Sequence, residues 1–300
     1  MLLRGMVILL LLVAALIGDA PAQQNQSLKT EDPPWLKELL PKRVVYTIPG
    51  MERVQVRKEI IYKRVADAQL KMDVYAPPGL TADSPRPAIV FIHGGAIPPN
   101  LRIQPKDWGV FISYGQLLAA SGFIAITFNH RFYGWENLND AQSDVDDLMT
   151  YIRHNASSLG IDRDRITLWA FSGGGPLLSS AIRDAPPYVR CIVSYYALMD
   201  PRTLRQEIPV SVSDQTLQTL SPLYYLNKKS IAPIFIARAG LDDTGFNVAI
   251  DQFVQEALSR NMTIDFSNHA EGHHAFDILD NNERSREIIK RTIEFIKSHN

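Results

Sequence analysis

Short apolar stretches, each bounded by polar or turn residues, recur along the chain from residue 54 onward. They are rich in β-branched and aromatic residues, which is typical of strands. We predict strands over Val54 to Tyr62, Leu70 to Tyr75, Ala88 to Ile92, Phe123 to Phe128, Arg165 to Ala170, Cys191 to Tyr196, Ile234 to Ala239 and Thr263 to Ser267. The third stretch is apolar at every position, as expected of a parallel strand covered by helices on both faces.

Segments with helical periodicity separate these strands from the third onward. Apolar residues three and four positions apart predict helices over Trp108 to Ala120, Ala141 to Ser157, Pro176 to Arg183, Asn247 to Leu258 and Arg284 to Lys297. This alternation predicts an α/β fold with a mostly parallel, doubly wound eight-stranded sheet, opened by an antiparallel hairpin and with helices on both faces. We assign residues 46–300 to this one domain and predict a small lid at about 199–230, where no clear strand occurs.

The first 45 residues have a different pattern. A short positive start precedes an apolar run from Met6 to Ile17, whose 12 residues fall short of the roughly 20 needed to cross a bilayer. Ala20-Pro21-Ala22 then provides the small residues of a cleavage site. We therefore expect a signal peptide over 1–22, cleaved after Ala22, and a secreted or periplasmic protein without a stable membrane anchor. Residues 23–45 are expected to form an N-terminal arm outside the core.

The composition excludes several other classes of protein. Hydrophobic residues at 46% and charged residues at 21% are typical of a folded globular domain. The net charge of −1 leaves no basic surplus to neutralise a phosphate backbone, so we expect no nucleic-acid partner. A single cysteine, Cys191, excludes an internal disulfide and a cysteine-based metal site.

The most specific motif follows the fifth predicted strand. That strand runs into Phe171-Ser172-Gly173-Gly174-Gly175 and then a helix, which places Ser172 on a sharp strand-to-helix turn. Such a turn requires small residues two positions before and after the serine, here Ala170 and Gly174. The alternative is a glycine-rich phosphate loop, but the lysine of a P-loop and the Gly-x-Gly-x-x-Gly spacing are both absent. We predict that Ser172 is a nucleophile.

A second glycine motif, His93-Gly94-Gly95-Ala96, ends the third predicted strand. Glycines let the backbone approach a reacting group closely, so the N–H of Gly94 or Gly95 and that of Gly173 are candidates for an oxyanion hole. We expect His93 to brace this loop. A plain tight turn would also explain the glycines, but their pairing with Ser172 in one sheet favours the functional interpretation.

A serine nucleophile needs a base, and the base needs an acid to fix its tautomer. His274 follows the last predicted strand, where a loop returns to the carboxyl edge of the sheet, and His273 is its adjacent rival. The alternative, a metal cluster of His269, His273 and His274, is disfavoured because Gly272 interrupts helical spacing and no acidic ligand pair is evident. We therefore expect neither a metal nor a cofactor.

Two carboxylates are candidates for the acid. Ala239-Gly240-Leu241-Asp242-Asp243 closes the strand before the histidine loop, and both aspartates stand at its end. The spacing alone leaves the choice between Asp242 and Asp243 open.

These residues occur in the order serine, aspartate, histidine, with the His-Gly-Gly motif upstream, and this pattern resembles the α/β-hydrolase superfamily. The resemblance covers roughly residues 54–297 and is strongest to secreted esterases and lipases of the His-Gly-Gly type and to the dienelactone-hydrolase-like branch. It implies an α/β-hydrolase fold. It also favours Asp242, by likeness to the Ala-Gly-Leu-Asp form of some esterases, and His274, because the base in these relatives commonly precedes x-Phe.

The chain departs from the family pattern in two places. Ala170 replaces the first glycine of Gly-x-Ser-x-Gly, and Ala96 replaces the third glycine of His-Gly-Gly-Gly, which weakens assignment to the hormone-sensitive-lipase group. True dienelactone hydrolases use a cysteine nucleophile, so Ser172 argues against their substrate.

We therefore expect a secreted serine hydrolase that cleaves small carboxylic esters through an acyl-enzyme. The residues expected to act are Ser172, Asp242 and His274 as the triad, with Gly94, Gly95 and Gly173 at the oxyanion hole. One alternative is a peptidase resembling the prolyl-oligopeptidase catalytic domain, against which the short arm and missing propeller count. Another is a non-catalytic binding protein on the same fold, which the presence of all three triad residue types disfavours.

Overall fold

The structure is a computed structural model that describes residues 34–66, 68–81, 84–227 and 231–300. The predicted signal peptide and the first part of the predicted arm lie outside these described residues. The strands are β1 (Gln55–Val65), β2 (Ala68–Ala76), β3 (Arg86–Ile92), β4 (Ile124–Phe128), β5 (Ile161–Phe171), β6 (Val189–Tyr195), β7 (Ile234–Ala239) and β8 (Ile264–His269). Each overlaps one predicted strand.

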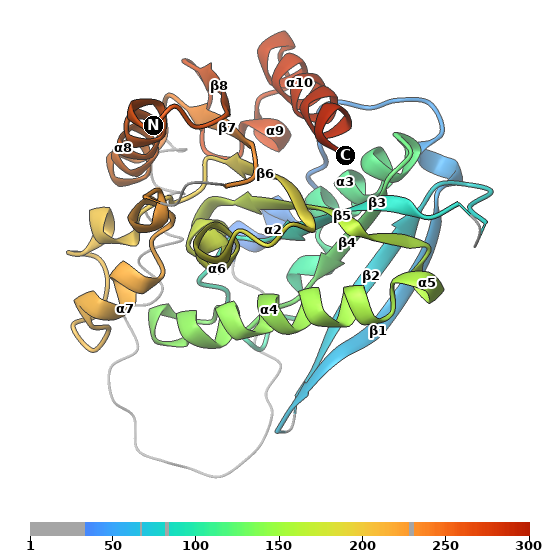
Figure 1. Cartoon of the computed structure of the whole chain (residues 1–300), viewed down its shortest axis with the longest axis horizontal. Helices are drawn as coiled ribbons and strands as arrows, with labels where there is room; N and C mark the ends of the chain where they lie inside the picture. Colours follow the sequence, from blue (N-terminus) through green and yellow to red (C-terminus); the bar gives the residue numbers. More distant parts are fainter. Residues whose placement is uncertain (1–33, 67, 82–83, 228–230) are drawn as a thin grey trace.

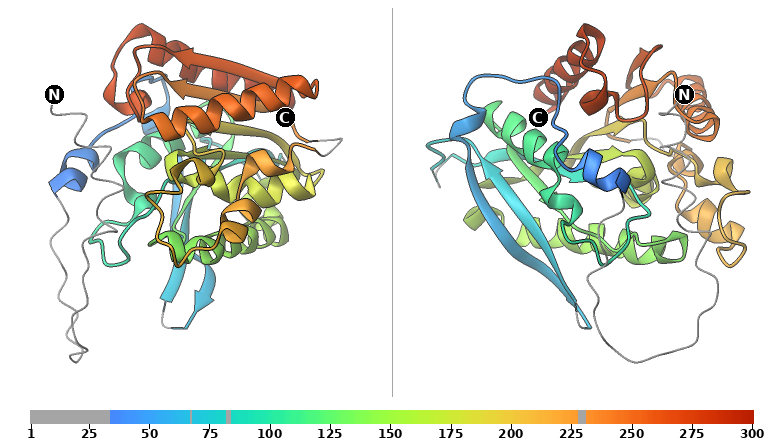
Figure 2. Two further views of the ribbon diagram at one scale, coloured as in Figure 1. Left: turned by 90° about the vertical axis from the view of Figure 1, so that its left-hand side faces the viewer. Right: turned by 180° about the vertical axis from the view of Figure 1, so that it is seen from behind.

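The eight strands form one sheet in the order β1-β2-β4-β3-β5-β6-β7-β8 (Figure 1). β1 and β2 are antiparallel to each other, and β2 is antiparallel to β4. All the other pairs are parallel. The long β1–β2 hairpin stands at one edge of the molecule (Figure 2). The predicted mostly parallel sheet with an antiparallel hairpin is thus confirmed.

Helices cover both faces of the sheet. The longer helices are α3 (Gly109–Ala120), α4 (Leu138–His154), α8 (Thr244–Ser259) and α10 (Glu283–His299). The shorter ones are α2 (Pro34–Leu39), α5 (Ala156–Leu159), α6 (Ser179–Asp184), α7 (Asp214–Thr219) and α9 (Phe276–Leu279). The 3₁₀ segments are η1 (Met51–Arg53), η2 (Pro105–Asp107), η3 (Trp135–Asn137), η4 (Ser172–Leu178), η5 (Pro201–Leu204) and η6 (Pro222–Tyr225).

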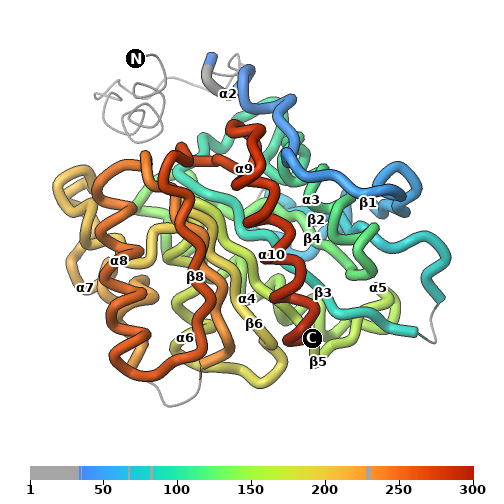
Figure 3. Tube along the Cα trace, turned by 90° about the horizontal axis from the view of Figure 1, so that it is seen from above, coloured from blue at the N-terminus to red at the C-terminus, as the bar shows by residue number. Residues whose placement is uncertain are grey.

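Successive side chains of β3 pack alternately into the two hydrophobic cores, one on each face of the sheet. Val90 packs in the cluster that includes residues of α4, α6 and α8, whereas Phe91 packs in the cluster that includes residues of α3 and α10. α10 runs along the sheet on the second face (Figure 3). Because successive side chains of a strand point to opposite faces, an apolar residue at every position fills both cores. This is the physical reason for the continuous apolar run in the sequence.

Two local features differ from the sequence expectations. The predicted helix from Pro176 begins as η4, and α6 follows only from Ser179. Three glycines have weak helical propensity, and Pro176 lacks the N–H that an α-helical turn would use. In the predicted arm, Leu36 of α2 and Val44 are buried in the core cluster with α3 and α10, so this part of the segment packs into the domain.

The described part of the predicted lid, residues 199–227, contains η5, α7 and η6. Thr203 of η5 donates a hydrogen bond to the carbonyl oxygen of Gly245 at 2.9 Å, which ties the segment to the first turn of α8. Ser211 donates to a carboxylate oxygen of Glu136 at 3.0 Å, on the segment that follows β4. The lid segment therefore packs beside the carboxyl edge of the sheet.

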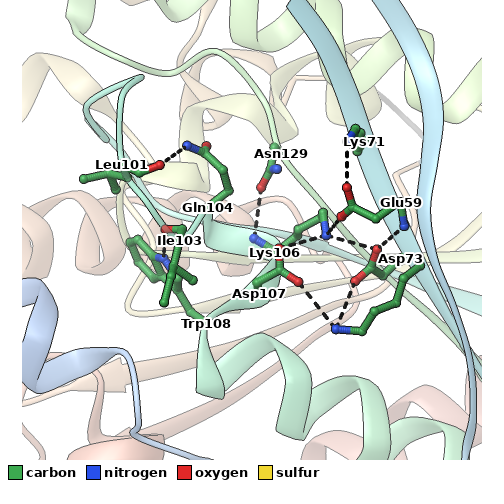
Figure 4. A network of polar contacts seen from close by, with 11 residues as sticks. Glu59, Lys71, Asp73, Leu101, Ile103, Gln104, Lys106, Asp107, Trp108 and Asn129 are labelled. Atoms are coloured by element: carbon green, nitrogen blue, oxygen red, sulfur yellow. Dashed lines mark hydrogen bonds and ion pairs between the residues drawn. The ribbon is translucent and has the colours of Figure 1, made fainter. Parts of the chain in front are cut away.

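A buried ion network fixes the segment that follows β3. The ammonium of Lys106, on η2, contacts a carboxylate oxygen of Asp73 on β2 at 3.1 Å and one of Asp107 at 2.8 Å (Figure 4). The side chains of Lys106 and Asp73 are 2% and 0% exposed. Glu59 of β1 completes the network, and Asn129 after β4 accepts a hydrogen bond from the backbone N–H of Lys106. The loop carrying the second glycine motif is thus anchored at its far end to the hairpin.

Candidate active site

Ser172 stands at the carboxyl end of β5 with a backbone φ of 54°. This left-handed conformation is unfavourable for a residue with a side chain and costs about 1–3 kcal/mol. The backbone around it leaves little space: a Cβ on Gly174 would lie 2.7 Å from the carbonyl oxygen of His93, and one on Gly175 would lie 2.2 Å from that of Leu198. The N–H of Leu198 also donates to the carbonyl oxygen of Ser172 at 2.9 Å. The tight packing of these glycines holds the serine in its strained turn.

His274 connects Ser172 to a carboxylate. Its Nε2 lies 2.8 Å from the Ser172 Oγ, and its Nδ1 lies 2.7 Å from Oδ2 of Asp242. Since a carboxylate only accepts, the N–H at Nδ1 donates to Asp242, and Nε2 is then the acceptor for the serine hydroxyl. The side chains of His274 and Asp242 are 9% and 0% exposed, so solvent screens the pair weakly.

The two candidate aspartates have different partners. Asp242 contacts the imidazole, and its other oxygen accepts a 2.7 Å hydrogen bond from the N–H of Asp243. Asp243 is instead the N-cap of α8, where its side chain accepts from the N–H of Gly245 at 2.7 Å. Of the two aspartates that the sequence spacing left open, Asp242 is therefore the one placed against His274.

The surroundings of His274 favour its protonated form. Burial acts to lower the pKa of His274, but the Asp242 carboxylate acts against it by charge and hydrogen bond, and the pKa is raised above its ordinary value. The rings of Tyr196 and Phe246 pack against the imidazole, with centroids 4.7 and 5.3 Å away. They restrict the ring to the orientation that faces both Ser172 and Asp242.

The neighbouring histidines do not join this group. His273 pairs with Asp280, with its Nδ1 3.0 Å from a carboxylate oxygen, and its side chain is 41% exposed. His269 lies near Asn282 and Ser285 instead. Across the described ranges, no three histidine, cysteine or acidic side chains are grouped as a metal site would need. The three histidines of the alternative metal cluster thus have separate partners.

The three glycines predicted for the oxyanion hole lie against the serine turn. A Cβ on Gly94 would be 2.9 Å from the Ser172 Cβ, and one on Gly173 would be 3.1 Å from the backbone nitrogen of Gly95. A Cβ on Gly95 would overlap the ring of Phe132, at 2.1 Å from its Cδ1. Only glycine at these positions lets the loop after β3 approach the turn after β5 so closely.

A stacked pair of histidines lies beneath this loop. The rings of His93 and His130 are 3.6 Å apart with an interplanar angle of 10°. The Nδ1 of His93 lies 2.6 Å from the carbonyl oxygen of Gly94, and the Nε2 of His130 lies 3.2 Å from that of His93. Since carbonyl oxygens only accept, both nitrogens carry protons. With its carbonyl held by His93, the planar Gly94–Gly95 peptide has its N–H directed to the opposite side.

Both stacked histidines are neutral. Burial lowers the pKa of His130 to about 3, and burial together with the adjacent His130 lowers the pKa of His93 well below its ordinary value. The second nitrogen of each ring is buried and has no hydrogen-bond partner among the residues that the structure describes. Protonation there would place a charge and an unsatisfied N–H in the core. The expectation that His93 braces the loop agrees with this arrangement, whereas the role of His130 was not foreseen from sequence.

The chain is similar to known proteins both in sequence and in fold. The BD-FAE family model matches residues 72–182, which include Ser172 and the loop after β3 but neither Asp242 nor His274. Over 128 residues the chain is 31% identical to the probable isoprenylcysteine alpha-carbonyl methylesterase ICMEL2 of Arabidopsis thaliana, covering 43% of this chain and 28% of that protein. Over 172 residues it is 30% identical to the para-nitrobenzyl esterase of Bacillus subtilis (strain 168), covering 52% and 33%.

A longer match, 23% identical over 215 residues, is to liver carboxylesterase 1 of Oryctolagus cuniculus, covering 69% of this chain and 34% of that protein. The chain thus spans about a third of the length of these curated relatives. Among solved structures, esterase Est2 of Thermogutta terrifontis with butyrate bound has a TM-score of 0.66 at 19% identity, covering 83% of this chain and 95% of that one. The same esterase phosphorylated by paraoxon has a TM-score of 0.64 at 18% identity, covering 84% and 94%.

The buried histidine pair predicts acid sensitivity of the fold. An unfolded histidine has a pKa of about 6.5, so the unfolded chain binds more protons than the folded one below that pH. The free energy of unfolding therefore decreases as the pH falls from about 6.5 towards the folded pKa of His130, about 3. We expect His130→Gln to flatten this decrease, measured by urea denaturation at a series of pH values. His154→Gln, at an exposed histidine, is the matched control and keeps the wild-type slope. An equal slope in wild type and His130→Gln would contradict the prediction.

Proposed function

We propose that this chain, which has the α/β-hydrolase fold, is a serine hydrolase that cleaves small carboxylic esters. One observation carries the proposal: the Ser172 Oγ, the His274 imidazole and the Asp242 carboxylate form a continuous chain of 2.8 and 2.7 Å contacts. In such a chain the histidine accepts the serine proton while the aspartate holds its tautomer.

The comparisons support the general part of the proposal, which is the fold and the hydrolysis of an ester. The likeness to α/β-hydrolases suggested by the motifs is confirmed by the fold, which matches solved esterases over most of the chain. The relatives found by sequence are named as a methylesterase, a carboxylesterase and a para-nitrobenzyl esterase. These names share hydrolysis of an ester, and this shared chemistry is what we carry over to the present chain.

In the proposed reaction, the Ser172 Oγ attacks the ester carbonyl carbon as its proton passes to the Nε2 of His274. The carbonyl oxygen gains the negative charge, and we assign the backbone N–H groups of Gly173 and of Gly94 or Gly95 to stabilise it. When the C–O bond breaks, the alcohol leaves with the proton from Nε2, and the acyl group stays on Ser172. Water then loses a proton to Nε2, attacks the acyl carbon and releases the carboxylic acid, and Ser172 regains its proton.

Asp242 acts only through His274 in this scheme. Its carboxylate accepts the Nδ1 proton, which keeps Nε2 free as the acceptor in the resting enzyme. When His274 becomes doubly protonated, the adjacent negative charge stabilises the imidazolium. The raised pKa of His274, with burial opposed by Asp242, is consistent with this role.

The central role of Ser172 predicts loss of both labelling and turnover. Ser172→Ala should remove labelling by a fluorophosphonate probe and lower the hydrolysis rate of p-nitrophenyl acetate by about 10⁴-fold or more. Ser221→Ala, at a buried serine of the lid segment, is the control and should keep labelling. Labelling of the Ser172→Ala variant would contradict the assignment of Ser172 as the nucleophile.

The two adjacent histidines provide a matched pair for the base. His274→Ala should be about as damaging as loss of the serine, since residues that act as one unit fail together. His273→Ala should cost roughly tenfold or less, since that side chain contacts Asp280 rather than Ser172. The measurement is kcat/KM for p-nitrophenyl acetate with purified variants. The reverse ranking would move the base to His273.

We also propose secretion, from the sequence pattern of residues 1–22 alone. Within the described residues, no helix combines the length and apolar character required to cross a bilayer. The proposal predicts that the mature protein begins at Gln23. N-terminal sequencing of protein recovered outside the cytoplasm tests it, and a chain that retains Met1 would contradict it.

A further inference from the structure

A second carboxylate is buried close to His274 and takes no part in the proposed reaction. Asp277 is 0% exposed and lies in α9, three residues after His274. Its Oδ2 accepts a 2.8 Å hydrogen bond from the hydroxyl of Tyr114 on α3, and its Oδ1 accepts a 2.7 Å bond from that of Tyr196, which follows β6. Two donors, one on each oxygen, match the needs of an ionised carboxylate.

This carboxylate is costly to the fold. Burying a charge is unfavourable by several kcal/mol unless an opposite charge compensates it. In the described part of the chain, the side-chain donors to Asp277 are the two neutral phenols. Burial raises the pKa of Asp277 above its ordinary value, and the hydrogen bonds from Tyr196 and Tyr114 offset only part of this effect. Leucine at position 277, with phenylalanine in place of Tyr114 and Tyr196, would fill the same space without the free-energy cost of burying a charge. Stability alone therefore gives no reason for a carboxylate at this position.

Tyr196 connects this carboxylate to His274. Its ring centroid is 4.7 Å from that of the imidazole, at an interplanar angle of 57°. The same ring carries the hydroxyl that donates to Asp277. Tyr196 and Ala275 both have left-handed backbone conformations, with φ of 38° and 62°. Strain of this kind collects at functional sites, and here it lies on both sides of the ring contact.

We propose that Asp277, acting through Tyr196, is a positioning residue that orients His274 and stabilises its protonated form during ester hydrolysis. The inference rests on the proposed function for its catalytic consequence, but not for its effect on the imidazole. A phenol that donates to a carboxylate has a more electron-rich ring, and an aromatic ring attracts a nearby cation. The Asp277 charge adds a direct attraction across the low-dielectric interior.

Among the described residues, the pH response of His274 depends on Tyr196, whose ring contacts the imidazole, and on the groups that bond to it or act on it by charge. Ser172 and Asp242 bond to the ring, Asp243 at the start of α8 acts through space, and Asp277 does so from α9. Burial lowers the pKa of His274, while Asp242 first, and then Asp277 and Asp243, raise it. Phe246 of α8 contacts the ring without charge. Removal of the Asp277 charge should therefore lower the pKa of His274 and leave Asp242 as its main support.

The test is an NMR titration of the His274 ring in the full chain, with the resonance assigned by its loss in His274→Ala. Asp277→Asn should give a lower His274 pKa than wild type. Its kcat/KM for p-nitrophenyl acetate should fall by about threefold and by no more than about thirtyfold, since complete loss of a buried cation–π contact sets the upper limit and the Tyr196 ring stays in place. The acid limb of the pH profile should move to lower pH.

Tyr195→Phe is the matched control. It removes a buried hydroxyl one residue away, which bonds to Thr292 rather than Asp277. It should leave the His274 pKa and the acid limb at their wild-type values even if it lowers the melting temperature. A merely structural role for Asp277 would make the two variants alike.

A second variant keeps the test decisive if Asp277→Asn does not fold. The triple change Tyr114→Phe, Tyr196→Phe and Asp277→Leu replaces the whole polar group with apolar side chains of similar shape, which is close to neutral for stability. It should lower the His274 pKa as well. An unchanged His274 pKa in either folded variant overturns the inference. Wild-type protein without Ser172-dependent hydrolysis would instead overturn the proposed function, and the titration would remain valid.

Discussion

The packing of backbone against backbone around Ser172 is the constraint on which the rest of the site depends. Ser172 keeps a φ of 54° because the glycines after it press against the carbonyl oxygens of neighbouring segments. Gly173 meets Gly95, Gly174 meets His93, and Gly175 meets Leu198. Each contact excludes a side chain, so the turn, the loop after β3 and the residues between β6 and the lid segment form one rigid unit. The hydroxyl is thereby held at a fixed point above the sheet, where the loop after β8 brings His274 to it.

Within this small region the pKa values of the buried histidines are shifted in opposite directions. His93 and His130 are buried against each other, the hydrogen-bond partners described for their rings are backbone carbonyls, and burial keeps both rings neutral. His274 is also buried, but Asp242 contacts it directly, and its pKa is raised despite the burial. The neutral pair maintains the shape of the glycine loop, whereas the imidazole beside a carboxylate is suited to accept a proton. The difference comes from the partners of each ring rather than from its exposure.

Sequence patterns predicted the parts of this molecule that repeat or that follow from local chemistry. The strands were found because both cores demand apolar residues on alternate sides. The sharp turn at Ser172 was found because such a turn requires small neighbours. His130, Tyr196 and Asp277 were not predicted as site residues, because their roles arise from contacts between segments far apart in the chain. The choice between Asp242 and Asp243 depended on where α8 begins, since the residue that caps the helix is not free to face His274. Leu36 was assigned to a polar arm because a single apolar turn has no periodicity from which its burial could be inferred.

The central claim, that Ser172 carries the acyl group during turnover, is tested most directly by trapping the intermediate. Purified protein mixed with p-nitrophenyl butyrate is quenched in acid after a few milliseconds, and its mass and tryptic peptides are measured. The account predicts a butyryl adduct on the peptide that contains Ser172, formed together with a burst of p-nitrophenol and lost as the ester is consumed. Steady ester hydrolysis with no adduct and no burst, or an adduct on a different residue, would contradict it.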